Sequence, residues 1–177
     1  MKPQEKRVNP TIRRATVDDA DAVAKVFEGP RVIWGTLQLP FPSPDIWRKR
    51  LQDGPGAGIV SIVACVEAEL VGIIGLHTHP DQPRIRHVAS MGMSVRDDWQ
   101  GRGIGKALVQ AAVDLADQWL ALSRVELNVF VDNEPAIRLY ERFGFKVEGT
   151  LAAAALREGR FVDVLMMARL APGLASR

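Results

Sequence analysis

One short glycine-rich segment most constrains how this chain can fold. It is Gln100-Gly-Arg-Gly-Ile-Gly105, and it stands between an apolar strand end and an amphipathic helical segment. Glycines let a backbone turn sharply and approach a ligand without a Cβ in the way. The helix that follows would point its unpaired N–H groups and the positive end of its dipole at that turn. The segment therefore predicts a strand–turn–helix unit that binds a phosphate or pyrophosphate.

Two other phosphate-binding motifs do not fit the segment. A P-loop needs Gly-x-x-x-x-Gly-Lys-Ser/Thr, but Ala107 follows Lys106, and Gln100 stands where the first glycine would be. A dinucleotide fingerprint needs Gly-x-Gly-x-x-Gly, which Gly101 and Gly103 begin and Lys106 breaks. The remaining pattern is Gln/Arg-x-x-Gly-x-Gly/Ala, and the segment satisfies it at every position.

A second motif follows at Asn128–Phe145. It contains an apolar strand pattern, Asn133, a helical stretch that carries Tyr140, and a Gly-Phe pair before the next strand pattern. Together the two motifs resemble the GNAT family of acetyl-CoA-dependent N-acetyltransferases. The resemblance extends over residues 11–170, which is nearly the whole chain.

The resemblance implies an α/β (α+β) fold in a single domain over residues 11–170. We expect a mixed, mostly antiparallel sheet of six or seven strands with helices on both faces. Strands four and five would splay apart around acetyl-CoA. The length of 177 residues fits one domain, and residues 1–10 and 171–177 are expected to be flexible ends.

Hydrophobic periodicity gives the same order of elements. The predicted strands are residues 11–16, 59–66, 70–77, 84–95, 125–131, 145–156 and 160–170. The predicted helices are residues 18–27, 44–53, 103–120 and 133–143. Gly29-Pro30 should end the first helix, and Ser43 should cap the second. An apolar stripe on the third helix is expected to face the core and comprises Ile104, Leu108, Ala111, Ala112, Leu115 and Trp119.

The resemblance makes acetyl-CoA the cosubstrate and implies no metal. The pantetheine arm would pair with the backbone of Met93, Ser94 and Val95 like an added strand. Asn133 would cap the following helix and also contact this arm. The pyrophosphate would be held by backbone N–H groups across Gln100, Gly101, Arg102, Gly103, Ile104, Gly105 and Lys106. The side chain of Arg102 or Lys106 could add charge toward the 3′-phosphate, or either could merely be solvated.

Two groups are expected to act on the thioester. Tyr140 is the only tyrosine of the chain and stands at the acid position of the family, so it would protonate the leaving thiolate. The alternative is that Tyr140 only packs between helix and sheet. An N–H near Met93 would polarise the thioester carbonyl and stabilise the oxyanion.

The general base stays open between several groups. His87 and Glu126 are candidates on strands four and five, His77 and His79 stand near the third-strand turn, and a water chain is the alternative. No acidic residue stands between His87 and Val95, where related enzymes can carry one.

The acceptor site is expected between the first two helices and a C-terminal strand loop. Trp34 and Leu37 would contact an apolar side chain, and Gln38 would bond a polar group. Arg157 could bind a substrate carboxylate, or it could merely flank a hairpin turn. Three segments resemble a bacterial subgroup that includes L-amino-acid N-acetyltransferases, namely residues 36–40, 129–133 and 155–163.

The expected reaction is acetylation of a primary amine of a small molecule, with an L-amino acid as the leading acceptor. Direct attack in a ternary complex is favoured because no nucleophile–base pair is visible. The alternatives are acetylation of a protein N-terminus or an antibiotic amine, and a non-catalytic acetyl-CoA-binding sensor.

Composition limits the partners. Lys and Arg number 23 against 21 Asp and Glu, and they are scattered, so no nucleic-acid partner is expected. The basic run Arg48-Lys49-Arg50 fits a solvated surface.

No apolar run approaches the ~18 residues of a membrane-spanning helix, and no signal-peptide pattern is visible, so we expect a cytoplasmic protein. The resemblance suggests a homodimer. Cys65 fits a small buried side chain rather than a nucleophile.

Overall fold

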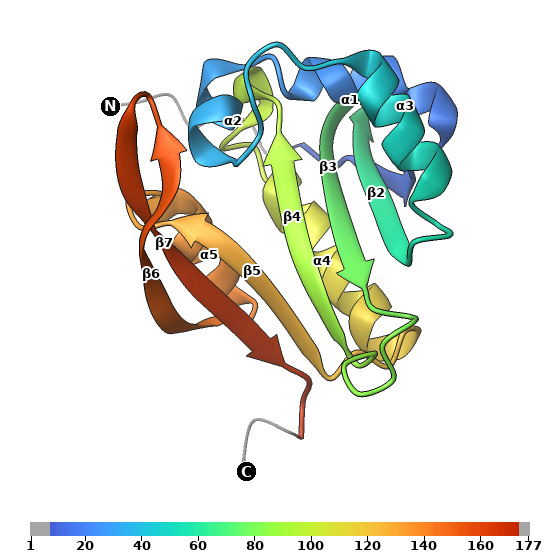
Figure 1. The fold of residues 1–177 in the computed structure, drawn as a ribbon. Coiled ribbons are helices and arrows are strands. Elements are labelled where there is room, and N and C mark those ends of the chain that lie inside the picture. The colour runs from blue at the N-terminus through green and yellow to red at the C-terminus, as the bar shows by residue number, and fades with distance from the viewer. Residues whose placement is uncertain (1–7, 174–177) are drawn as a thin grey trace.

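Seven strands form one sheet in the order β1-β2-β3-β4-β5-β7-β6 (Figure 1). The structure is a computed structural model and describes residues 8–173. All neighbouring strands are antiparallel except β4 and β5, which are parallel. The predicted mixed, mostly antiparallel sheet is confirmed. The strands are β1 (Thr11–Arg14), β2 (Ile59–Val66), β3 (Glu69–Thr78), β4 (Val88–Val95), β5 (Arg124–Phe130), β6 (Lys146–Arg157) and β7 (Arg160–Leu170).

Helices cover both faces of the sheet (Figure 1). They are α1 (Ala20–Val26), α2 (Pro30–Gly35), α3 (Pro44–Asp53), α4 (Ile104–Gln118) and α5 (Glu134–Arg142), with short 3₁₀ turns η1 (Val17–Asp19) and η2 (Asp97–Trp99). The helices α1 and α3 share a core with β2 and β3 on one face. On the other face α4 and α5 bury a larger core against the central strands. This burial of apolar side chains is the main force that holds the layers together.

Local sequence signals account for several elements. The Ser43 hydroxyl accepts a hydrogen bond from the Ile46 N–H at 3.4 Å and caps α3, as predicted. The β2–β3 hairpin turns at Glu67 and Ala68, whose φ angles are 57° and 96°. Two successive residues with positive φ make a turn whose twist matches that of the flanking strands.

Some boundaries differ from the predictions. Pro30 also begins α2, because proline at the first helical position loses no hydrogen bond. Strand β4 begins at Val88 and not at residue 84, since the preceding residues form a turn. Trp119 follows the last residue of α4 and is 78% exposed, so it does not continue the apolar stripe. Cys65 is half-buried in β2.

The parallel strands β4 and β5 pair only where they begin. Their Cα partners run from Val88 with Arg124 to Ser90 with Glu126. Further along, β4 stays paired with β3 up to Val95, while β5 stays paired with β7. The two halves of the sheet therefore diverge. This confirms the prediction that strands four and five splay apart.

The two expected flexible ends fall mostly outside the described residues, which omit residues 1–7 and 174–177. Val8 is described, and its N–H donates to the Arg102 carbonyl at 3.2 Å. The chain just before β1 thus lies against the glycine-rich segment at residues 100–105, called the glycine turn below.

Candidate active site

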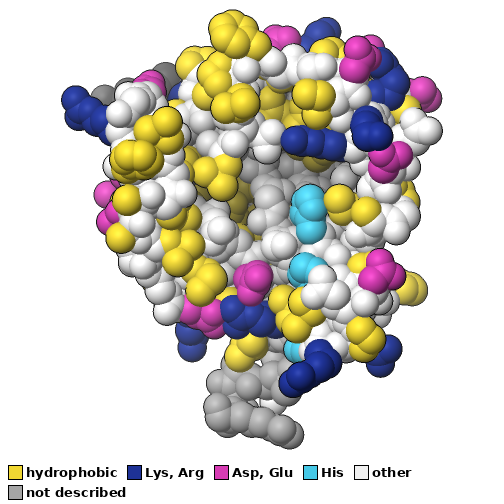
Figure 2. Space-filling view, viewed as in Figure 1, with side chains coloured by type: hydrophobic (Ala, Val, Ile, Leu, Met, Phe, Trp, Pro, Cys, Tyr) yellow, Lys and Arg dark blue, Asp and Glu magenta, His cyan; other side chains and the backbone are white. Residues whose placement is uncertain are grey.

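A cavity of about 1800 Å³ opens where β4 and β5 diverge. Figure 2 shows it as a hollow in the face of the molecule, with histidine side chains beside it. The glycine turn forms one part of its lining, and the segment from α2 to α3 forms another. Typical single-ligand pockets are about 300–1000 Å³, so this cavity has room for two substrates.

The glycine turn presents backbone N–H groups at the start of α4. Gly101 and Gly103 have φ angles of 78° and 94°, which side chains rarely adopt. The Ala107 N–H makes the first helical bond, to the Gly103 carbonyl at 3.1 Å, and the N–H groups before it have no acceptor within the helix. Ile104 buries its side chain in the core, at 1% exposure. The arrangement suits a bound pyrophosphate.

The Gln100 side chain braces the connection between β4 and the turn. Its Nε2 donates to the Val95 carbonyl at 3.0 Å and to Asp97 Oδ1 at 3.3 Å. The Asp97 carboxylate also accepts from the backbone N–H groups of Arg31, at 2.9 Å, and Val32, at 3.0 Å. Asp97 thus caps α2 although it is distant from that helix in the sequence. The sequence analysis did not predict this role.

Positive charge gathers beside the turn. The guanidinium of Arg102 lies 4.9 Å from the Trp99 ring centroid, and Lys106 is exposed at the start of α4. Both line the cavity, as does Arg142 from the end of α5. These cations are placed to attract the phosphates of a cofactor.

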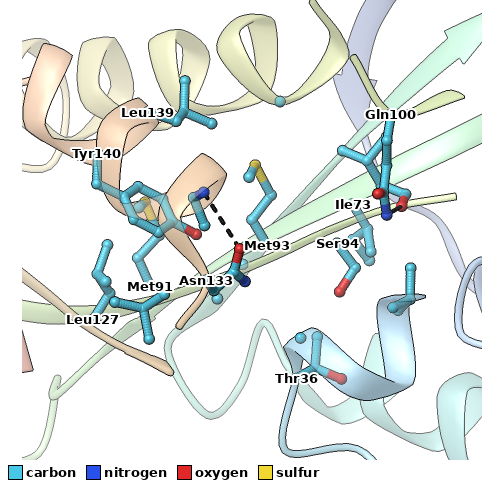
Figure 3. A pocket seen from close by; sticks show the side chains of 18 of the residues that line it. Thr36, Ile73, Met91, Met93, Ser94, Gln100, Leu127, Asn133, Leu139 and Tyr140 are labelled. Carbon is cyan, nitrogen blue, oxygen red and sulfur yellow. Dashed lines mark hydrogen bonds between the residues drawn. The ribbon is translucent and has the colours of Figure 1, made fainter. Parts of the chain in front are cut away.

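Tyr140 both packs in the core and reaches the cavity. It is 7% exposed, and its ring centroid lies 5.8 Å from that of Phe145. Its hydroxyl points from α5 toward Asn133 and Met93 (Figure 3), and within residues 8–173 it has no hydrogen-bond partner. Burial raises the pKa of Tyr140 to about 12, so the phenol is protonated at neutral pH and can donate.

Asn133 caps α5, as predicted. Its Oδ1 accepts from the Ala136 N–H at 3.4 Å, marked by a dashed line in Figure 3. The side chain lines the cavity, and a Cβ at Gly35 would come within 3.2 Å of its Nδ2. The end of α2 therefore approaches the start of α5 across the gap.

The edge of β4 forms the cavity wall at Met93, Ser94 and Val95. Gly92 precedes them and is the register partner of Gly75 in β3. A Cβ at Gly92 would meet nothing within 4 Å. Gly92 therefore leaves the cavity open at this point of β4.

His77 is the histidine that lies in this cavity, whereas His79 and His87 are absent from its lining. A Cβ at Gly75 would come within 3.2 Å of His77 Nε2, so the imidazole lies over Gly75. Partial burial, and to a smaller extent the charge of Arg50, lowers the pKa of His77 below 6.5. The imidazole is therefore neutral at pH 7.

Glu126 also lines the cavity, in the same row of paired residues across the sheet as His77. His77 is the partner of Ser90, and Ser90 is the partner of Glu126, so the three side chains share one face. The Glu126 carboxylate accepts from Arg124 Nε at 3.0 Å. It is thus already paired, unlike the imidazole.

Three of the predicted acceptor residues, Trp34, Leu37 and Gln38, also line the cavity, from the end of α2 and the segment that follows it. Gln38 Oε1 accepts from the Arg50 guanidinium at 3.2 Å. Arg50 also lines the cavity, although its basic run reads in the sequence as solvated surface.

Arg157 is not part of the cavity lining. Its guanidinium forms two hydrogen bonds with Asp132 and lies 4.0 Å from the ring centroid of Trp34 and 4.7 Å from that of Phe130. Arg157 therefore packs against Trp34, which lines the cavity. Binding of a substrate carboxylate by Arg157 stays a prediction.

The described residues contain no group of three or more His, Cys, Asp or Glu side chains that could hold a metal ion. No helix within residues 8–173 is long and apolar enough to cross a membrane.

Comparison with known proteins identifies the family. Residues 26–145 match the model of the acetyltransferase (GNAT) family. The chain belongs to this family. The enzyme is 42% identical over 159 residues to the L-amino acid N-acetyltransferase AaaT of Escherichia coli (strain K12). The matched residues make up 90% of this chain and 96% of the relative. The resemblance inferred from the two motifs is confirmed, and the enzyme is an acetyl-CoA-dependent N-acetyltransferase.

Two further likenesses are informative. The enzyme is 31% identical over 145 residues to an N-alpha-acetyltransferase of Sulfurisphaera tokodaii, over 76% of this chain and 79% of the relative. A phosphinothricin acetyltransferase from Sinorhizobium meliloti, solved in complex with AcCoA, superposes with a TM-score of 0.83. That match has 22% identity and covers 96% of this chain and 93% of the other, so it supports the fold.

Proposed function

We propose that the enzyme acetylates the α-amino group of a free L-amino acid by direct attack in a ternary complex. The observation that carries this proposal is the single cavity beyond the Ser90–Glu126 pair. Both the glycine turn and the residues Trp34 and Gln38 line it, so two ligands can meet in it. The 42% identity to an L-amino acid N-acetyltransferase supports the acceptor class.

The residues present fit acetyl-CoA, which supplies an activated acetyl thioester when it is bound. The positive φ angles of Gly101 and Gly103 expose the N–H groups that would hold the pyrophosphate, and Lys106 adds charge. The edge of β4 at Met93–Val95 is not paired with β5, so it is available to hydrogen-bond the pantetheine arm. The Asn133 side chain, which also lines the cavity, would contact this arm.

His77 is our proposed general base. An amine with a pKa near ~8 is partly protonated at neutral pH, and its remaining protons become acidic as it attacks a carbonyl. A neutral imidazole in the cavity can accept such a proton. His77 has no competing hydrogen bond among the described residues, whereas Glu126 is held by Arg124.

Tyr140 and Met93 would act on the thioester, whereas His77 would act on the amine. The Tyr140 phenol would donate its proton to the leaving thiolate, a step worth ~10²–10⁴ in rate. The backbone N–H at Met93 would polarise the thioester carbonyl, worth ~10²–10³.

Cationic acceptors such as polyamines fit the cavity less well. The acidic residues in its described lining are Glu126 and Asp132. Glu126 is paired with Arg124 and Asp132 with Arg157, so neither offers an uncompensated negative charge. A protein N-terminus remains the second candidate, because the enzyme also resembles an N-alpha-acetyltransferase.

Thiol release from acetyl-CoA tests the proposal across free L-amino acids, polyamines, aminoglycosides and short peptides. We expect the highest kcat/KM with an L-amino acid, with phenylalanine and methionine foremost. A preference for peptides or polyamines would refute the acceptor assignment. If no compound of the panel is acetylated although acetyl-CoA binds tightly, the result would indicate a protein substrate or a non-catalytic sensor instead.

Direct transfer has a separate test by mass spectrometry. Incubation with acetyl-CoA and no acceptor should leave the mass of the protein unchanged. A stoichiometric gain of one acetyl group would instead reveal a covalent acyl-enzyme.

We further propose a cytoplasmic homodimer. Leu156 and Phe161 at the end of the β6–β7 hairpin are 66% and 73% exposed, and apolar side chains exposed together favour contact with another protein surface. Sedimentation equilibrium at micromolar concentration should give twice the chain mass; a monomer would contradict the proposal.

A further inference from the structure

Arg50 is held in a fixed orientation on the acceptor side of the cavity. It stands in the last turn of α3, and its guanidinium carbon lies 4.8 Å from the ring centroid of Trp47. One nitrogen, Nη1, donates to Gln38 Oε1 at 3.2 Å. A guanidinium has five N–H donors in a rigid fork, so most of the donors of Arg50 remain available to a ligand.

Arg50 differs from the paired arginines of the enzyme. Arg13, Arg124 and Arg169 each form two hydrogen bonds with one carboxylate, on Asp19, Glu148 and Asp117 respectively. Within residues 8–173 Arg50 has no carboxylate partner, and its one polar partner is a neutral amide. Its positive charge is therefore uncompensated by an acid and acts on its neighbours, which include His77 in the cavity.

The other cations that line the cavity have different positions. Arg31 donates to the Asp97 carbonyl at 3.0 Å and lies close to the Asp97 carboxylate. Arg102 and Lys106 belong to the glycine turn, and Arg142 to the end of α5. Arg50 is thus the cation on the α3 side, next to the predicted acceptor residue Gln38.

We infer that Arg50 binds the α-carboxylate of the acceptor, braced by Gln38 and Trp47. The inference rests on the proposed function, because it assumes a free amino acid as acceptor. A planar guanidinium can hold a carboxylate through two parallel N–H···O bonds. One carbon separates the carboxylate from the α-amine, so this contact would keep the amine on the His77 side of the cavity.

The test compares the free amino acid with its amide. Initial rates are measured for wild type, Arg50→Gln, Arg50→Lys and Lys49→Gln, with L-phenylalanine or L-methionine and with the corresponding primary amide. The amide keeps the amine and side chain but lacks the carboxylate charge. Lys49 is the matched control, since it is exposed on the same helix and pairs with Asp53 at 3.3 Å, away from the cavity lining.

We expect Arg50→Gln to raise KM for the free amino acid roughly ten- to hundredfold, the loss of a charge-assisted hydrogen bond. KM for the amide and for acetyl-CoA should change little, and Arg50→Lys should lie between Arg50→Gln and wild type. Lys49→Gln should match wild type. The change in the acid-to-amide preference is the readout, and general structural damage would not produce it.

The outcomes separate the two proposals. If wild type acetylates free amino acids and Arg50→Gln keeps the wild-type preference for acid over amide, the role of Arg50 is refuted and the proposed function stands. If wild type acetylates no free amino acid, both are refuted.

Discussion

Ser90 and Glu126 are the last Cα partners between β4 and β5. Beyond this pair the two strands follow separate neighbours, β3 and β7. The backbone groups of Met93–Val95 that face the gap therefore lack a strand partner there. The position of this last pair determines where a thioester and an amine can meet.

Tyr140→Phe should lower kcat about 10²–10⁴-fold, because it removes the proposed general acid. The binding of acetyl-CoA should change little, since phenylalanine keeps the packing against Phe145. Steady-state kinetics together with calorimetry of CoA binding would measure both. Unchanged turnover would remove Tyr140 from the mechanism.

The two proposed proton-transfer groups set the pH dependence of kcat. His77 must be neutral, and because burial lowers its pKa below the ordinary value, it stays neutral at pH 7 and gains a proton only on the acid side. Tyr140 must be protonated, and its pKa of about 12 keeps it so throughout the measurable alkaline range. We expect kcat to fall on the acid side and to show no alkaline loss from the phenol below about pH 11.

His77→Gln should lower kcat by about 10²-fold, the lower end for general-base catalysis, because water can partly replace the imidazole. The acid limb of the kcat profile should weaken or disappear in the variant. His87→Gln is the matched control, since His87 is exposed and outside the cavity lining. An unchanged acid limb in His77→Gln would assign that limb to another group.

Gly103→Ala should destabilise the enzyme by about 1–2 kcal/mol, the cost of a left-handed conformation for a residue with a Cβ. Its φ is 94°, and the space around it is open, so strain rather than a clash is the cause. The Kd for CoA should rise because the turn relaxes away from its anion-binding shape. Urea unfolding and calorimetry measure the two effects.

Gly149→Ala is the control for that prediction. A Cβ at Gly149 also meets nothing within 4 Å, and its φ is not positive. Equal effects in both variants would argue against backbone strain at the turn.

Asp97→Ala should cost about 1–2 kcal/mol of stability, the range for losing a helix cap, because the N–H groups of Arg31 and Val32 lose their acceptor. KM for the acceptor should also rise, since α2 carries Trp34. Asp98→Ala is the control, because Asp98 is exposed and its carboxylate bonds the Arg96 side chain rather than the N–H groups of α2. If acceptor KM is unchanged in Asp97→Ala, α2 keeps its position without the cap.

The sequence predicted the turn and most elements because their causes are local. Gly101 and Gly103 are required by the backbone conformation of the turn itself, and Ser43 and Asn133 cap helices that begin beside them. The period of the apolar residues identified the strands and α4. Such signals need only a few neighbouring residues.

The boundary errors arose where a local signal has two outcomes. Pro30 can end one helix or begin the next, and the short α2 is held by Asp97, which is distant in sequence. Trp119 continues the helical spacing, but α4 ends before it. Neither outcome is decided by the neighbouring residues.

The sequence by itself determined the family, the acetyl donor and the candidate acid, because the glycine turn and the Asn133–Tyr140 segment are contiguous motifs. Only the tertiary structure decided which cations and bases share the cavity. Arg50, Gln38 and His77 come from α3, the segment before it, and β3, and nothing in their spacing brings them together. Their proximity depends on how α3 packs beside the sheet and where β4 and β5 diverge, which are long-range packing properties.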